Sequence, residues 1–125
     1  MTKSQPNRLR RRALLAVVAT LAIPTAALAH HGWSSYDAGN VLTIEAPILI
    51  AKYQNPHGEI EMTDTAGKRW QIVLAPPSRM ESRGLPREQL VAGARATVVG
   101  YPSRTQPAEI RAERITIAGK TVELR

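Results

Sequence analysis

The chain has 125 residues, with 17 Lys and Arg against 10 Asp and Glu, and it contains no cysteine. The lack of cysteine excludes disulfide bonds and thiolate metal ligands, so any metal would have to be bound by nitrogen and oxygen atoms. The length suits one modest domain behind a leader segment.

The first 29 residues have the three-part form of a secretory signal peptide. Lys3 and the four arginines between positions 8 and 12 make a basic start, residues 13–23 form an uncharged apolar run, and Ala27 and Ala29 are the small residues that a signal peptidase requires. The apolar run is shorter than the roughly 20 residues that span a bilayer. We therefore expect cleavage after Ala29 and a periplasmic protein with no membrane span.

Three alternatives to this interpretation stay open. Cleavage after Ala27 would leave Leu28 at the terminus, and an uncleaved segment would act as a membrane anchor. The pair Arg11-Arg12 also resembles a twin-arginine export signal, whereas the general secretory route needs no such pair.

Removal of the leader changes the charge of the chain. Residues 1–29 hold 5 of the basic residues and no acidic one, so residues 30–125 carry 12 basic against 10 acidic residues, a net charge of +2. Basic residues in this part, such as Arg69, Arg95 and Arg111, are scattered, and we interpret most of them as solvent-exposed. We expect no nucleic-acid partner.

The first half of the domain predicts three strands. Residues 41–53 are rich in β-branched and apolar side chains, and Pro47 requires an edge, a bulge or a bend there because proline cannot donate to a strand ladder. Residues 58–63 and 69–74 alternate polar and apolar side chains on either side of a turn at 64–68, which predicts a hairpin.

The second half predicts a short helix and two or three strands. Ser78 is the expected cap of a helix that runs to Arg83 and stops at Gly84. A strand at 94–101 follows, and then one at 109–117 whose apolar residues change phase, so we expect a bulge near Glu113 or Arg114. A turn at 118–120 leads to a final strand at 121–124.

This order predicts an all-β fold in a single domain at residues 30–125. Three strands, a short helix between strands 3 and 4, and two or three further strands match a small five- to six-stranded OB-like Greek-key barrel, with an open sandwich as the alternative. The chain has no phenylalanine, so we expect an aliphatic core built from these residues: Leu42, Ile44, Ile48, Ile50, Ile60, Met62, Trp70, Ile72, Leu74, Leu90, Val98, Ile110, Ile115 and Ile117.

Several short motifs together resemble an uncharacterised family of small exported bacterial proteins, a domain of unknown function. They are His30-His31 after the Ala-x-Ala site, Tyr36-Asp37, Asn55-Pro56-His57, the tryptophan at Trp70, and Gly100-Tyr101-Pro102. The resemblance covers nearly all of residues 30–125 and implies export and a barrel-like fold. The family usually has Arg-x-Gly-Trp after the helix, whereas this chain has Arg83-Gly84-Leu85. The resemblance implies no function.

The three histidines predict a metal site. His30 would become the mature N-terminus, where its free amine and imidazole can chelate a transition metal. His57 follows Pro56 and precedes Gly58, so it is expected at a restrained loop tip. Imidazole nitrogens suit copper and zinc. With His57 as a third nitrogen, the site would be a T-shaped copper site of the histidine-brace kind.

Two other arrangements stay open. The terminal amine, the next peptide nitrogen and the His31 ring would form a planar copper chelate that needs no folded domain. His57, Glu59 and Glu61 are spaced by two and share a strand face, so His30 or His31 could complete a zinc site with them. Without any metal, the His-His pair would be only a tolerated cleavage flank, and His57 would cap its loop.

We therefore expect a periplasmic metal-binding carrier or accessory protein that uses His30, His31, His57 and Glu59, with copper as the metal and zinc as the alternative. The second hypothesis is a non-metal binding module that contacts a periplasmic protein, a peptide or a sugar through its barrel surface, with Trp70 and Tyr101. Trp33 and Tyr36 would wall the metal site or anchor the N-terminal arm. We expect no enzyme, because no nucleophile elbow and no phosphate-binding glycine loop is present.

Overall fold

The structure is a computed structural model that describes residues 32–125. The expected signal peptide, its cleavage site, His30 and His31 lie outside the described residues. Among residues 32–125, no helix is both long and apolar enough to cross a membrane.

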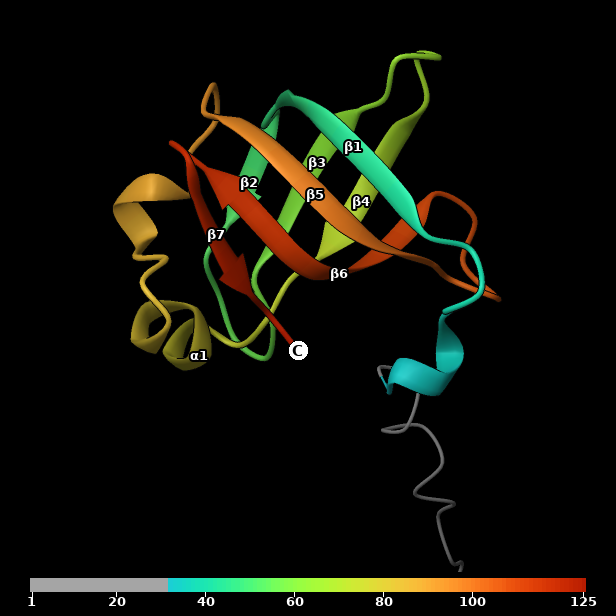
Figure 1. Ribbon diagram of the computed structural model, residues 1–125, viewed down its shortest axis with the longest axis horizontal. Coiled ribbons are helices and arrows are strands. Elements are labelled where there is room, and N and C mark those ends of the chain that lie inside the picture. The colour runs from blue at the N-terminus through green and yellow to red at the C-terminus, as the bar shows by residue number, and fades with distance from the viewer. Residues whose placement is uncertain (1–31) are drawn as a thin grey trace, which may run out of the picture.

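Strands dominate the described part of the chain, with one short α-helix between the fourth and fifth (Figure 1). This confirms the expected β-rich class with one short helix. The sheet has seven strands and not the expected five or six, because the expected strand at 41–53 forms two strands, so the helix follows the fourth strand and not the third. The elements, in chain order, are the 3₁₀ helix η2 (Trp33–Ser35), β1 (Leu42–Pro47), β2 (Ile50–Lys52), β3 (Glu59–Thr63), β4 (Arg69–Val73), α1 (Pro77–Ser82), the 3₁₀ helix η3 (Arg87–Gln89), β5 (Arg95–Pro102), β6 (Glu109–Ile117) and β7 (Lys120–Glu123).

The seven strands form one sheet in the order β1-β5-β6-β4-β3-β2, and β7 pairs with β6 outside this path. All neighbours are antiparallel except β4 and β6, which are parallel. The path has two ends, β1 and β2, which are not paired with each other. In Figure 1, β1, β5 and β6 cross in front of β2, β3 and β4, so the sheet folds over on itself and encloses the core.

The expected strand at 41–53 is divided into β1 and β2 just after Pro47, which confirms the bend. Ile48 turns its backbone toward the start of β5, since its N–H donates to the Ala94 carbonyl at 2.9 Å. The Leu49 N–H then donates to the Glu61 carbonyl, although Glu61 is already the register partner of Ile50. Two residues therefore face one, which is the geometry of a β-bulge.

The extra residue changes which side chains of this segment face the core. Ile48 is only 1% exposed, whereas Ile50 is 40% exposed, so the prediction that Ile50 is a core residue is wrong. Ala51 packs against the core in its place. A one-residue shift moves the following side chains to the opposite face of a strand. Strict alternation from Ile48 therefore predicted the wrong face for Ile50.

A second bulge lies in β6, where the sequence predicts one. Val99 pairs with Arg114, and the next residue of β5, Gly100, pairs with Ala112, so Glu113 is the extra residue. The two apolar phases of β6 consequently face the same core, as the burial of Ile110 before the bulge and Ile115 after it shows.

The core is aliphatic apart from Trp70, and α1 closes one end of it. Met80 of α1 and Leu85 after it are fully buried, and neither was among the expected core residues. The helix begins at Pro77, and its N-cap position is Pro76 with no side-chain cap, so the prediction that Ser78 caps the helix is wrong. Proline in the first turn already has helical φ, which explains the early start.

Arg79 of α1 and Arg83, its C-cap residue, bind the backbone at the end of β7 and just after it. Arg79 Nη1 donates to the Leu124 carbonyl at 3.2 Å, and Arg83 Nη1 donates to the carbonyls of Glu123 and Arg125, each at 2.8 Å. The helix therefore both fills the core and holds the last residues of the chain.

Gly100 is the glycine whose replacement should cost most stability. A Cβ at this position would overlap the Arg111 carbonyl oxygen and lie 2.9 Å from the Ala112 Cα, and backbone atoms cannot move aside as a flexible side chain can. We predict that Gly100→Ala lowers the free energy of unfolding by roughly 1–3 kcal/mol. Gly39→Ala is the control, because its Cβ would meet only ordinary contact. Urea denaturation that gives equal midpoints for the two variants would contradict this prediction.

Candidate functional site

The described half of the expected metal site lies at the start of β3. His57 is half-buried in the loop between β2 and β3, and Glu59 is the first residue of β3. The neighbour of His57 fixes this loop to the rest of the fold, because the Gly58 N–H donates to the Ala75 carbonyl at 2.9 Å and the Gly58 carbonyl accepts from Leu74 N–H at 2.8 Å. The imidazole therefore sits beside a well-held backbone position.

Gly58 also has a packing role. A Cβ on this residue would lie 2.6 Å from the Cε of Met80, so the absence of a side chain lets α1 approach the loop. The sequence predicts a turning glycine here, but Gly58 does not have the positive φ that favours glycine, and close approach is the role that the structure assigns to it.

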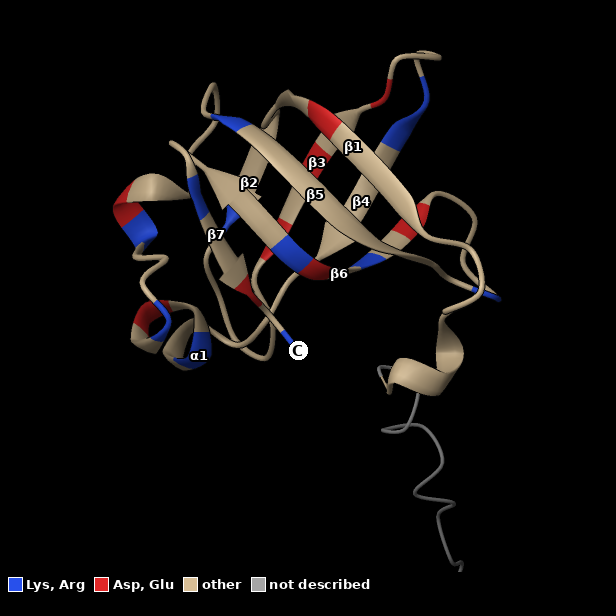
Figure 2. Cartoon of the chain, in the orientation of Figure 1, with Lys and Arg blue, Asp and Glu red and all other residues tan. Residues whose placement is uncertain are grey.

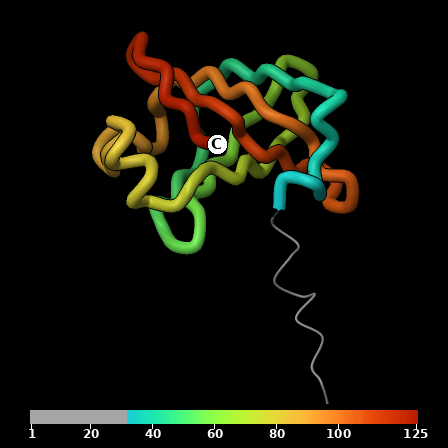
Figure 3. Tube along the Cα trace, turned by 60° about the horizontal axis from the view of Figure 1, so that its bottom comes forward, coloured from blue at the N-terminus to red at the C-terminus, as the bar shows by residue number. Residues whose placement is uncertain are grey.

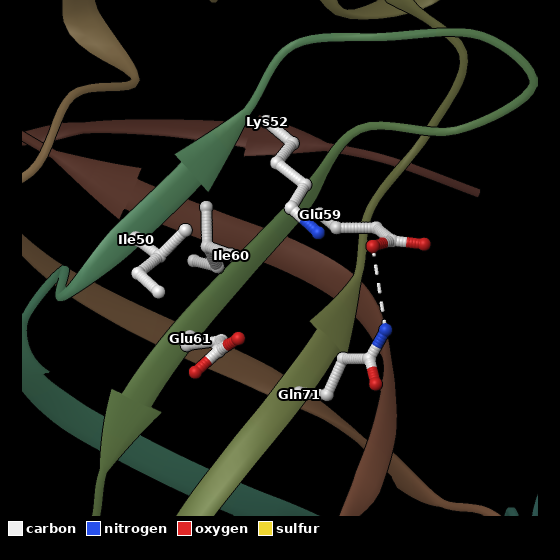
Figure 4. Close-up of a pocket in the computed structure, with 6 residues that line it drawn as sticks. All are labelled: Ile50, Lys52, Glu59, Ile60, Glu61 and Gln71. Carbon is white, nitrogen blue, oxygen red and sulfur yellow. Dashed lines mark hydrogen bonds between the residues drawn. The ribbon is translucent and has the colours of Figure 1, made fainter.

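Glu59 and Glu61 lie on the outer face of β3, as their spacing predicts. Both line a small surface pocket with Ile50 and Lys52 of β2 and Gln71 of β4 (Figure 4). Each carboxylate has a partner on β4: Glu59 accepts from Gln71 Nε2 at 3.3 Å, and Glu61 pairs with Arg69 Nε at 2.5 Å. The two acids are therefore engaged across the strands.

Residues 32–125 contain no group of three His, Asp or Glu side chains that could hold a metal ion. A metal site based on His57 or Glu59 would therefore need ligands from outside the described residues, and His30 and His31 are the histidines there. The structure consequently leaves the roles of His30, His31, His57 and Glu59 as predictions.

A second group of polar and aromatic residues lies along the outer row of β6. Figure 2 shows this row as alternating acidic and basic bands, formed by Glu109, Arg111, and then Glu113 and Arg114. Arg111 lies opposite Tyr101 of β5 in the strand register. The segment that begins at η2 packs over this row, and Figure 3 shows it beside the β5–β6 loop.

Tyr36 fastens this segment to the sheet. It is only 2% exposed, its hydroxyl donates to Glu109 Oε1 at 2.6 Å, and its backbone forms a bridge with Ser103. Burial, with a further contribution from the hydrogen bond to Glu109, raises the pKa of the Tyr36 hydroxyl, whereas Arg111 acts in the opposite direction. Tyr36 is therefore an anchor for the N-terminal arm, one of the two roles that the sequence left open.

Arg111 is the buried charge of this group. It is 4% exposed, so the interpretation of this arginine as solvent-exposed is wrong. Burial lowers the pKa of its guanidinium, while the charges of Tyr36 and Glu109 raise it. The segment from η2 to Tyr36 covers this side chain, and sequence periodicity alone does not reveal such a cover.

Two guanidinium groups lie against the Trp33 ring. Arg111 Cζ is 5.1 Å from the centre of the Trp33 ring, and Arg125 Cζ is 4.7 Å from it. Tyr101 meets the same ring edge-on, with 6.2 Å between centroids and an interplanar angle of 74°. Cation–π contacts of this kind contribute about 0.5–2 kcal/mol each. We refer to Trp33, Arg111, Arg125 and Tyr101 as the Trp33 clasp.

The aromatic residues assigned to the alternative binding surface are engaged elsewhere. Trp70 is buried, its Nε1 donates to Asp64 Oδ2 at 2.8 Å, and Lys68 Nζ lies 3.7 Å from the ring centre. The Tyr101 hydroxyl donates to Glu113.

Sequence reasoning missed the Trp33 clasp, although a signal for it exists. Glu109, Arg111 and Glu113 alternate in the strand just where the apolar phase slips, and Trp33, Tyr36 and Tyr101 are three of the few aromatic residues in the chain. The alternating charges in a strand and the small number of aromatic residues could together have suggested that the charged residues and the aromatic residues pack against each other.

The buried Tyr36 hydroxyl generates a pH prediction. A phenol whose folded-state pKa is raised contributes stability below its unfolded value near 10, and this stability is lost as the pH rises above that value. We predict that the free energy of unfolding falls between pH 9 and about 11, and that Tyr36→Phe weakens this fall while lowering stability at pH 8 by about 1 kcal/mol. Urea titrations across this range are the measurement, and an unchanged pH slope in the variant would refute the assignment.

Comparison with protein-family models identifies the family of the chain. The model of a family of unknown function, DUF6152, matches residues 17–110, about three quarters of the chain. The matched range includes the Ala29–His30 junction, His57 and Glu59. A search of curated proteins gives no match. The chain therefore belongs to the family of unknown function DUF6152.

Proposed function

We propose that the protein is an exported, periplasmic metal-binding protein whose site forms at a mature N-terminus created by cleavage after Ala29. It would act as a carrier or accessory factor for copper, with zinc as the alternative metal. The observation that carries the proposal is the anchoring of the chain at Trp33 and Tyr36, immediately after the His30-His31 pair. A terminus at residue 30 would begin only three residues from the clasped tryptophan.

The reach of this terminus is short. Three residues span about 10 Å at full extension, so the amine of His30 would stay within that distance of Trp33, which contacts Arg111 of β6. Amine and imidazole nitrogens of one residue form a chelate that favours copper and zinc over oxygen-seeking cations. The proposed site therefore belongs to the folded domain and not to a free tail.

His57 is the proposed third nitrogen ligand. In Figures 1 and 3, the β2–β3 loop and η2 lie on the same lower side of the molecule. An imidazole has two ring nitrogens, so a contact of one with the protein orients the other toward a metal. Glu59, two residues further, would be an oxygen ligand if the metal is zinc.

The proposed scaffold is an OB-like Greek-key barrel. Support comes from the bend after Pro47: β1 and β2 are two halves of one segment, and they occupy the two ends of the strand path. If β1 and β2 are counted as one strand, this strand links both ends of the path. The resulting strand order is the one expected for such a barrel with its helix between strands 3 and 4. We assign binding and no catalysed reaction to this scaffold.

A second candidate function is a protein-binding module. Leu49, Ile50 and Val91 are three of the four large apolar side chains that are exposed among residues 32–125. They gather at one corner, because Ile48 bonds to Ala94 and the Ala94 N–H donates to the Val91 carbonyl at 3.2 Å. Gathered apolar residues on a soluble surface are typical of contact sites. This function would not depend on a free His30 amine.

Copper titration of the protein that begins at His30 tests the proposal. The matched control carries three extra alanines at the N-terminus, since a single alanine would place His31 third and create a different tight copper chelate. We predict that the extended form binds Cu(II) more than about tenfold more weakly, the scale on which ligand surroundings affect metal affinity. Equal binding by both forms, or no binding by either, would contradict a terminal site.

His57→Ala separates the folded site from a simple terminal chelate. We predict that this variant loses one nitrogen from the Cu(II) paramagnetic resonance spectrum, whereas His31→Ala keeps it, because only the planar chelate uses the His31 ring. The reverse pattern would assign the copper to His30 and His31 alone. Unfolding midpoints of both variants serve as the control for folding.

A further inference from the structure

We infer that the surface where α1 meets β7 binds an extended acidic segment of a partner protein. Four exposed cations line this surface, and we refer to Arg79, Arg83, Lys120 and Arg125 together as the α1–β7 basic surface. Figure 2 shows basic bands on α1, on β7 and at the end of the chain, on one side of the molecule. The inference does not depend on the proposed metal site.

The net charge of the domain is concentrated around this surface. Residues 77–90 and 118–125 hold five basic and three acidic residues, whereas the rest of residues 30–125 holds seven of each. The net charge of +2 therefore belongs entirely to these two segments. Such an uneven distribution favours a partner of opposite charge at this place.

The three acidic residues of these segments interact with other groups. Glu123 is paired with an arginine of β6 at 3.0 Å. Burial, and after it the charge of Glu81, raises the pKa of the Tyr53 hydroxyl, while Arg87 lowers this pKa and Glu88 raises it. The Cζ of Arg87 also lies 4.8 Å from the centre of the Tyr53 ring. These acids therefore do not balance the charge of the α1–β7 basic surface.

Contacts with the backbone hold the arginines of this surface beside one another. Arg79 Nη1 donates to the Leu124 carbonyl at 3.2 Å, and Arg83 Nη1 donates to the carbonyls of Glu123 and Arg125 at 2.8 Å each. Both guanidinium groups thus lie along the same three residues of the chain. Their positions are set by the fold and not by a bound anion.

Lys120 and Arg125 extend the row in the two directions of β7. A Cβ on Gly84 would overlap the Lys120 ammonium, so this cation lies over the residue that follows the C-cap of α1. The Cζ of Arg125 lies 4.7 Å from the centre of the Trp33 ring. An extended backbone from residue 120 to 125 is about 17 Å long, the length of an extended peptide of about six residues.

The four cations have the bonding capacity to hold carboxylates. Among residues 32–125, no ion pair engages any of them, and the remaining residues of the chain contain no Asp or Glu. A guanidinium has five N–H donors, and the backbone bonds of Arg79 and Arg83 are both made by Nη1. Guanidinium groups match carboxylates in bidentate geometry, and a carboxylate placed among neighbouring cations relieves their mutual repulsion.

An acidic peptide fits this arrangement better than an anionic membrane does. Arg79 and Arg83 are held against the backbone of residues 123–125, and Glu123 is exposed within the same stretch. A flat anionic surface would meet Glu123 together with the cations. The side chains of an extended peptide can instead reach the cations one by one.

Titration of the protein with hexaglutamate, followed by NMR of the backbone amides, tests the inference. We expect the largest shifts at Gly84 and at residues 120–125, and we expect them to decrease as salt is added, because salt screens exposed charges. Hexaglutamine is the control peptide and should leave these signals unchanged. Shifts confined to other parts of the sheet, or no shifts at all, would overturn the inference.

Removal of two charges makes the test quantitative. Lys120→Gln combined with Arg125→Gln keeps the backbone bonds that Arg79 and Arg83 make with their side chains. We expect this double variant to bind hexaglutamate at least about tenfold more weakly, the scale of a lost hydrogen bond between charged groups. Its unfolding midpoint reports whether the fold is kept.

The matched control is Lys68→Gln combined with Arg104→Gln. It removes the same charge from the β3–β4 turn and the β5–β6 loop, on the other side of the molecule from α1 (Figure 1). We expect it to bind hexaglutamate within about twofold of the wild type, because distant exposed charges are screened. Equal weakening in both double variants would overturn the inference, since net charge alone would then attract the peptide. Binding to phosphatidylglycerol vesicles without binding of hexaglutamate would also overturn it and would assign the surface to a membrane.

Discussion

The extra residue at Glu113 is the constraint on which both the sheet and the N-terminal arm depend. Without it, the two apolar phases of β6 would face opposite sides, and either Ile110 or Ile115 would leave the core. With it, the first part of β6 pairs with β4 and the second part with β7. The Glu113 side chain accepts from Tyr101, and its carbonyl accepts from Leu124 N–H at 2.7 Å, so the bulge is itself well bonded.

The charged residues on the outer row of β6 face the N-terminal arm, the segment that begins at η2. Arg111 is buried under Trp33 and Tyr36, and burial of a cation is costly unless nearby groups compensate for it. Here a carboxylate, a tyrosine hydroxyl and an indole face surround it, contributed by β6 and by the segment that begins at η2. The arm is therefore part of the folded domain, and removal of its aromatic residues would expose a charge that the sheet alone does not compensate.

Sequence patterns predicted the parts of this fold that depend on one segment at a time. Alternation located the β3–β4 hairpin, proline located the bend after Pro47, and the phase slip located the bulge at Glu113. Errors arose where two segments meet. Ile50 is exposed because a bulge that the sequence did not predict follows the bend. Arg111 is buried because the N-terminal arm, which is distant in sequence, covers it. For the site, the sequence located His57 beside a held glycine, whereas the Trp33 clasp was not predicted because its residues come from segments far apart in the sequence.

Membership of the DUF6152 family leaves function to be argued from chemistry. In our account, the domain serves to hold a terminus that export creates, and the nitrogen that matters is in amide linkage until the leader is removed. The mass of the intact protein recovered from the periplasm tests this claim most directly. The account predicts the mass of a chain that begins at His30. A chain that begins at any other residue, or that keeps its leader, would contradict it.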